Sequence, residues 1–129
     1  MQVANLREVE SFTTLDGSTI REVAGPAWTA ARNQSLAEAT VPPGAETFEH
    51  LHRTSEEIYF FTAGAGRMRL GEEEREVREG DCVVIPPGTP HKLWAGDAEA
   101  LVLLCACAPA YSDEDTVLLE GPGGSRPDS

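Results

Sequence analysis

Short runs in which apolar and polar residues alternate cover most of this chain, and glycine or proline bounds each run. Alternation with a period of two places successive side chains on opposite faces of a β-strand, whereas an amphipathic helix has a period near 3.6. The alternation predicts strands at 18–23, 34–41, 46–51, 57–62, 66–70, 74–78, 82–85, 91–94 and 100–107. No window of about 12 residues carries a helical stripe, and only 26–33 has the character of a single helical turn.

Many short strands separated by frequent turns indicate an all-β sandwich or barrel. An internal echo supports two similar layers, because a Pro-Pro-Gly turn follows a strand and precedes a histidine at both 42–44 and 86–88. With 129 residues and 13.9 kDa, the chain has the length of one domain. We assign residues 1–120 to this domain, including an N-terminal strand segment. The final segment, 121–129 (GPGGSRPDS), has nothing to bury and is expected to be disordered.

The chain is strongly acidic, with 22 Asp and Glu against ten Lys and Arg and a net charge of −12. Such a surface repels phosphate backbones and anionic lipids, which argues against nucleic-acid and membrane partners. The N-terminus lacks the basic start and apolar run of a secretory signal, and three cysteines make no disulfide framework. We therefore expect a cytoplasmic protein.

The residues that could bind a metal lie on two segments about forty residues apart. His50 and His52 share the parity of a strand, so both side chains point to one face. Glu57 leads into the apolar run IYFF, where a buried carboxylate is costly unless it meets a cation. Imidazole nitrogens and one carboxylate oxygen are good ligands for first-row transition metals, and His91 follows the second Pro-Pro-Gly turn.

The spacing of these residues resembles the two sequence motifs of the cupin family. The first motif is matched, in chain order, by Gly44, His50, His52, Glu57 and Gly64, and the second by Gly80, Pro86, Gly88 and His91. One departure is Ala95, which stands where the second motif commonly has an asparagine that is usually not a ligand.

The resemblance implies a small double-stranded β-helix, the cupin jelly-roll barrel, formed by one domain. It further implies that His50, His52, Glu57 and His91 hold one divalent transition metal per chain (Fe, Mn, Ni, Zn, Co or Cu). Four protein ligands leave about two open positions on an octahedral ion. Small cupins also resemble one another in pairing as homodimers through strands at the N-terminal side, which we expect here.

Other residues near these motifs have less specific interpretations. Glu56 is the rival of Glu57 as a ligand, and parity with Tyr59 together with the interval to Gly64 favours Glu57. Cys105 and Cys107 share one strand face, where buried cysteines are usually small packing residues, although a functional thiol is the alternative. Four apolar side chains are further candidates to line a pocket: Tyr59, Phe61, Met68 and Trp94.

Two adjacent open positions on a metal suit a small-molecule substrate that chelates through two oxygens. The resulting hypothesis is an enzyme of small-molecule metabolism, either a dioxygenase or a Lewis-acid isomerase, cyclase or lyase, with Glu57 as a catalytic base. The alternative is a cupin module that binds a ligand or metal without turnover. Fold alone does not decide between them.

Overall fold

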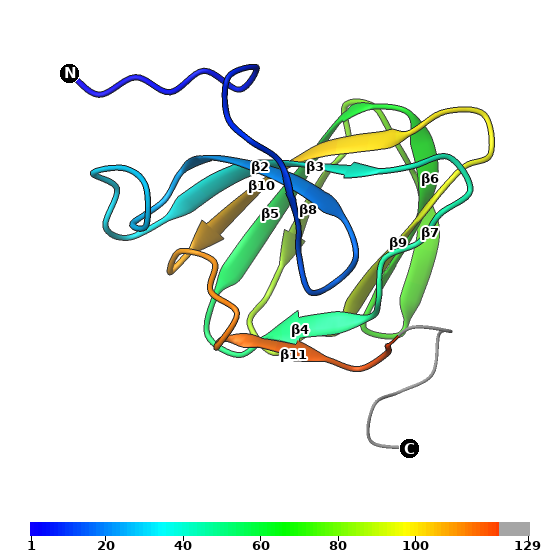
Figure 1. Ribbon diagram of the computed structural model, residues 1–129. Helices are drawn as coiled ribbons and strands as arrows, with labels where there is room; N and C mark the ends of the chain where they lie inside the picture. The colour runs from blue at the N-terminus through cyan, green and yellow to red at the C-terminus, as the bar shows by residue number, and fades with distance from the viewer. Residues whose placement is uncertain (122–129) are drawn as a thin grey trace.

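The alternating segments form two antiparallel sheets that curve around a shared interior (Figure 1). The computed structural model describes residues 1–121, and no helix occurs within that range. In chain order the strands are β1 (Phe12–Thr13), β2 (Thr19–Ala24), β3 (Ser35–Val41), β4 (His50–His52), β5 (Glu56–Ala63), β6 (Ala65–Leu70), β7 (Glu73–Arg78), β8 (Cys82–Ile85), β9 (His91–Ala95), β10 (Leu101–Ala108) and β11 (Thr116–Leu118).

The strand order shows how the chain winds through the barrel. One sheet has the order β1-β2-β3-β10-β5-β8, and the other has the order β11-β4-β9-β6-β7. Strands that follow each other in sequence therefore lie in different sheets at several points, such as β3 and β4 or β9 and β10. This winding confirms the predicted all-β jelly-roll barrel.

The core lies between the inner faces of the two sheets. Along β5 the residues Tyr59 and Phe61 are buried, while Ile58 and Phe60 are exposed. Glu57 shares the inner face with Tyr59 and Phe61, as its parity predicts. The inner face of β5 thus carries a carboxylate directly beside the apolar core.

The strand predicted at 46–51 is wrong over its first part, since β4 is limited to His50–His52. The backbone N–H of Thr47 donates to the carbonyl of Leu93 on β9, but the next N–H, from Phe48, donates to the carbonyl of Asp16 instead. The ladder is interrupted because the β1–β2 connection takes that hydrogen bond. Strands β1 and β11 were not predicted, because two or three residues are too short for an alternation to be recognised.

The predicted Pro-Pro-Gly reversals are confirmed. In both turns an N–H donates three residues back, from Ala45 to Pro42 and from Thr89 to Pro86. The segment 26–33 forms a turn without becoming a helix. The predicted disordered tail lies, except for Gly121, outside the described residues. Within residues 1–121 no helix is long and apolar enough to cross a membrane.

Candidate metal centre

Three histidines meet inside the barrel because β4 and β9 pair with each other. His50 and His52 lie two residues apart on β4, so both point inward, and His50 is the antiparallel partner of His91 on β9. One ring nitrogen of each histidine lies within 4.8 Å of the corresponding nitrogens of the other two. All three side chains are buried. The structure therefore brings together the imidazoles of both sequence motifs.

The opposite nitrogen of each ring is held by a hydrogen bond that fixes its tautomer. Nδ1 of His50 lies 2.9 Å from the carbonyl oxygen of Phe48, and Nδ1 of His91 lies 3.0 Å from that of Thr89. A carbonyl only accepts, so both Nδ1 atoms carry the proton. Each ring thus directs Nε2 toward the shared centre.

His52 reaches the same arrangement through a hydroxyl on β11. Its Nδ1 lies 3.0 Å from Thr116 Oγ1, and that hydroxyl donates its own proton to the carbonyl of Ser112 at 2.9 Å. The Thr116 oxygen must then accept from His52 Nδ1. The sequence did not identify Thr116 as a site residue. Its role depends on the pairing of β11 with β4, and the local pattern of the chain does not reveal that pairing.

Glu57 lies against two of the imidazoles. Its Oε1 atom is 3.1 Å from Nε2 of His52 and 3.4 Å from Nε2 of His91. Its other oxygen accepts a hydrogen bond from the thiol of Cys107 at 3.1 Å. The neighbouring Glu56 is exposed, so the structure places only Glu57 of the two rival carboxylates inside.

The ionisation of the cluster follows from burial and from mutual charge. Burial lowers the pKa of His50 to about 4, repulsion from His91 adds to the shift, and Asp16 opposes it. Burial alone would raise the pKa of Glu57, but the adjacent imidazoles of His52 and His91 outweigh burial and hold that pKa well below its usual range. Near pH 7 the centre therefore combines a neutral His50 with an ionised Glu57.

This arrangement fits a cation. Nε2 of His91 is buried and has no hydrogen-bond partner among the described residues. Nε2 of His50 carries a lone pair and faces Oδ2 of Asp16 at 3.8 Å. Lone pairs that converge in a buried space repel one another unless a proton or a metal ion lies between them. The donor set of nitrogen and carboxylate oxygen suits a divalent transition metal, and the Nδ1 hydrogen bonds supply the outer partners that such ligands require.

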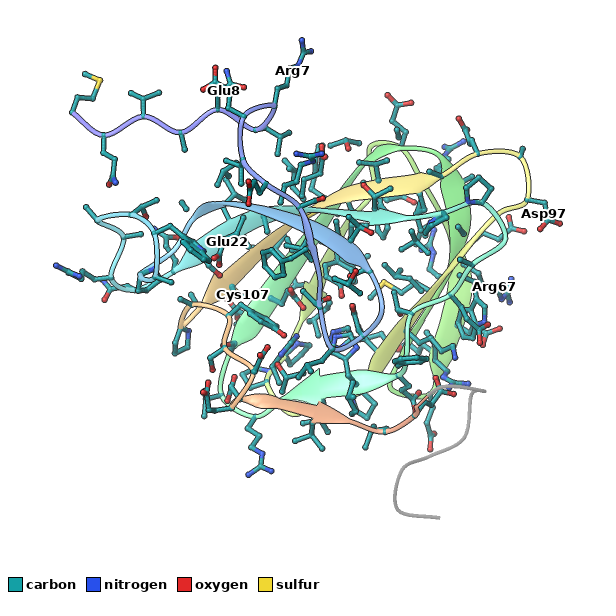
Figure 2. All side chains as sticks on the ribbon, in the orientation of Figure 1. Arg7, Glu8, Glu22, Arg67, Asp97 and Cys107 are labelled. Atoms are coloured by element: carbon teal, nitrogen blue, oxygen red, sulfur yellow. The ribbon has the colours of Figure 1, made fainter. Side chains whose placement is uncertain are left out.

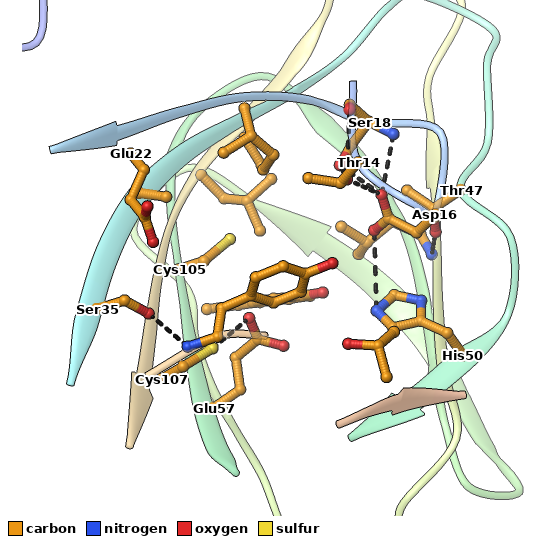
Figure 3. Close-up of a pocket in the computed structure, with 18 of the residues that line it drawn as sticks. Thr14, Asp16, Ser18, Glu22, Ser35, Thr47, His50, Glu57, Cys105 and Cys107 are labelled. Atoms are coloured by element: carbon orange, nitrogen blue, oxygen red, sulfur yellow. Dashed lines mark hydrogen bonds and ion pairs between the residues drawn. The ribbon is translucent and has the colours of Figure 1, made fainter. Parts of the chain in front are cut away.

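Asp16 is a second carboxylate at the centre that sequence reasoning did not identify as a site residue. It lies in the turn between β1 and β2, and its side chain points at His50 (Figure 3). In the sequence it belongs to an Asp-Gly pair, which signals a turn and nothing about chemistry. Only the folding of that turn over the barrel reveals the contact.

A cavity of about 50 Å³ adjoins the centre. Tyr59, Cys105 and Cys107 line it, and Cys107 points into the barrel while Arg67 and Asp97 point away from it (Figure 2). Burial raises the pKa of both cysteine thiols well above the usual range, and the charge of Glu57 acts in the same direction. Both groups are therefore protonated near pH 7, which favours a packing and hydrogen-bonding role over a nucleophilic one.

Three of the four residues expected to line this pocket lie elsewhere. Trp94 is on the outer face of β9, where Arg69 and Lys92 contact its ring at 5.6 Å and 5.3 Å. Strand alternation explains this placement, because Trp94 lies one residue beyond the inward-facing Leu93. Met68 and Phe61 belong to the buried core.

Comparisons with known proteins agree with the fold. The family described as Cupin domain matches residues 37–107. Protein MJ1618 of Methanocaldococcus jannaschii is 47% identical over 113 residues, covering 88% of this chain and 90% of that protein. Protein SchB of Streptomyces halstedii is 33% identical over 85 residues, covering 65% of this chain and 62% of SchB.

Solved structures with the same fold are more distant in sequence. A variant of Streptomyces PAC13 with uridine has a TM-score of 0.76 and 16% identity, over 94% of this chain and 92% of that one. KdgF from a Halomonas species has a TM-score of 0.73 and 20% identity, over 88% of this chain and 97% of that one. At these identities the likeness establishes the barrel alone.

Proposed function

This chain belongs to the cupin domain family, and from that premise we propose that it is a metal-dependent enzyme of small-molecule metabolism. The proposed ligands of one divalent transition metal per chain are His50, His52, His91 and Glu57. The proposed substrate chelates the ion through two oxygens. The single observation that carries the proposal is the buried Nε2 of His91, which lacks a hydrogen-bond partner within residues 1–121 while it faces the other imidazoles.

When bound, the metal would polarise a carbonyl as a Lewis acid or, if redox-active, support oxygen chemistry. The chain's own residues would hold and orient the reactants. The three Nδ1 hydrogen bonds keep the imidazoles aimed at the centre, and Cys107 fixes one oxygen of Glu57. That leaves Oε1 of Glu57 to serve as a ligand and, in the proposed role, as the base that takes a proton from the substrate. The three histidines and Glu57 are buried, which shields the centre from bulk water.

Solved proteins of this fold give limited support for catalysis. Pac13 is described as a nucleoside dehydratase, and its structures include complexes with uridine. A barrel of this shape can therefore house chemistry on a small molecule.

The proposal predicts that the metal-free protein takes up one divalent ion per chain, as measured by equilibrium dialysis with elemental analysis. Glu57→Gln should lower the affinity by about tenfold, because the amide is a weaker ligand while the three nitrogens remain. Glu56→Gln is the matched control and should bind like the wild type, because that side chain is exposed. Failure of the wild-type protein to bind any first-row divalent ion would refute the metal function.

The second candidate function is a module that binds a small ligand or metal without turnover. A screen of oxygen uptake and product formation with chelating substrates separates the two. Turnover that depends on metal and is lost in Glu57→Gln supports the enzyme. The non-catalytic module is supported if the ligand binds stoichiometrically but no product forms with any metal that fully occupies the protein.

We also propose a homodimer. The outer face of the six-stranded sheet carries exposed Leu36, Ile58, Phe60 and Val84, and the strand registers place Ile58 beside Val84. A contiguous apolar sheet face of this kind suits packing against the same face of a second copy. The surface differs from the N-terminal strand edges expected from the resemblance.

The dimer predicts a mass in sedimentation equilibrium of twice the chain mass of 13.9 kDa at micromolar concentration. Phe60→Glu should shift the protein to the monomer, because it buries a charge in the apolar contact. Trp28→Glu removes an exposed aromatic, more exposed than Phe60, from another surface and should leave the dimer intact. A wild-type monomer at these concentrations would contradict the proposal.

A cytoplasmic location stays part of the proposal. All three cysteines, including the exposed Cys82, are free thiols. Free thiols persist most readily in a reducing compartment.

A further inference from the structure

Asp16 uses its two carboxylate oxygens for different tasks. Oδ1 accepts hydrogen bonds from the Thr14 hydroxyl at 2.7 Å, from the Ser18 N–H at 2.9 Å and from the Ser18 hydroxyl at 2.6 Å. Oδ2 takes part in none of these and points at Nε2 of His50, 3.8 Å away (Figure 3). One oxygen therefore builds the turn, and the other faces the proposed metal centre.

The backbone fixes this second oxygen in place. The N–H of Phe48 donates to the carbonyl of Asp16 at 2.8 Å, and the carbonyl of Phe48 accepts from Nδ1 of His50. The turn is closed by the N–H of Thr14, which donates to the carbonyl of Ser18 at 3.0 Å. Phe48 thus links the turn to the histidine, so the position of Asp16 relative to His50 is set by main-chain contacts.

The charges around the cavity have one sign. Asp16 faces His50, and Glu57 contacts His52 and His91. Glu22 also lines the cavity, and no Lys or Arg is present among its described lining residues. Asp16 and Glu57 already balance the two charges of a divalent ion held there, and Glu22 adds a further negative charge to the lining. A further anion would add an uncompensated negative charge to a buried site, which is costly.

We infer that Asp16 selects the ligand: its free oxygen accepts a hydrogen bond from a hydroxyl or amide of an uncharged chelating ligand, and its charge rejects carboxylate and phosphate ligands. The inference rests on the proposed metal function and specifies its substrate class. The cavity of about 50 Å³ has room for a few water-sized groups, so small chelators can test the inference.

The test compares two matched probes on the cobalt(II)-loaded protein. Glycolamide and glycolate have the same hydroxyl and the same size, but only glycolate is negatively charged. Dissociation constants are read from the visible absorption of cobalt. In Asp16→Asn the amide oxygen retains the turn's hydrogen bonds, and the negative charge is gone. Glycolate should bind more tightly and glycolamide more weakly, so that the ratio of their constants shifts by at least about tenfold.

Two further variants separate local contact from general charge. Asp97→Asn removes the same charge from an exposed loop and should leave the ratio unchanged. Glu22→Gln removes a charge from the cavity without touching the Asp16 turn. It should shift the ratio in the same direction as Asp16→Asn but by less, and this variant also carries the test if Asp16→Asn fails to fold.

The outcomes separate the inference from the function on which it rests. Cobalt stoichiometry is measured before any probe is added, and an absence of bound cobalt in the wild type would refute the metal function and the inference together. With cobalt bound, equal changes for both probes in Asp16→Asn would overturn ligand selection by Asp16 while the metal centre stands.

Discussion

His91→Ala is expected to lower the affinity for a divalent metal by more than about hundredfold, because loss of an outer partner of a ligand alone typically costs 10–100-fold. Alanine removes one of three converging nitrogens and opens the site. Equilibrium dialysis against cobalt(II), followed by elemental analysis of the protein, measures the change. This is the largest effect we expect at the centre.

The variant should still fold. In the metal-free protein, Nε2 of His91 is already buried and has no hydrogen-bond partner in the described part of the chain, so its removal relieves one unfavourable group while it leaves a small cavity. Tyr111→Phe is a suitable control, since its ring packs against His52 at 5.8 Å but offers no nitrogen. Metal content that is unchanged in a folded His91→Ala protein would show that the two motifs do not share one ion.

Gly64→Ala is expected to lower the free energy of unfolding by about 2–5 kcal/mol, from positive φ and overpacking together. Gly64 has φ of +83°, and a Cβ at this position would overlap the carbonyl oxygen of Ala100. The overlap is with backbone on the β9–β10 connection, which cannot rotate away. Urea unfolding followed by circular dichroism gives the free energy.

Gly80→Ala is the matched control, because Gly80 has a similar φ of +92° and nothing within 4 Å of a Cβ. Its free energy of unfolding should fall by only about 1–2 kcal/mol, which is the conformational cost of a positive φ. Equal losses in the two variants would mean that the approach of Ala100 to Gly64 does not matter. Both glycines occupy motif positions. Comparing them therefore separates two reasons for a glycine in the motif: a positive φ and the close approach of another backbone segment.

The alternation along the chain predicts most of the barrel, because the apolar positions of a strand with one buried face show which of its side chains point inward. Along β5 it places Glu57 on the inner face and Ile58 on the outer face. The two histidine segments are also predicted, because the Pro-Pro-Gly turn that precedes each of them can be recognised from neighbouring residues alone. Their convergence required the family resemblance, because nothing in either segment alone specifies its partner.

The rest of the centre depends on contacts that leave no local signal. Asp16 reaches His50 only because the β1–β2 turn takes a hydrogen bond from Phe48. Thr116 holds His52 from a strand of three residues, which is too short for its alternation to be recognised. Residue type predicts a pocket position for Trp94, but strand parity places its ring on the outer face, where Arg69 contacts it.

The contact between Thr116 and His52 also has a consequence for biosynthesis. His52 lies near the middle of the chain, whereas the hydroxyl that orients its imidazole comes from β11, 64 positions later. A ribosome would have to release the chain through Thr116 before that histidine acquires its final tautomer. Delivery of the ion would accordingly be a late maturation event that follows translation, and a chain truncated before β11 would lack a properly set ligand even if the earlier strands had already assembled.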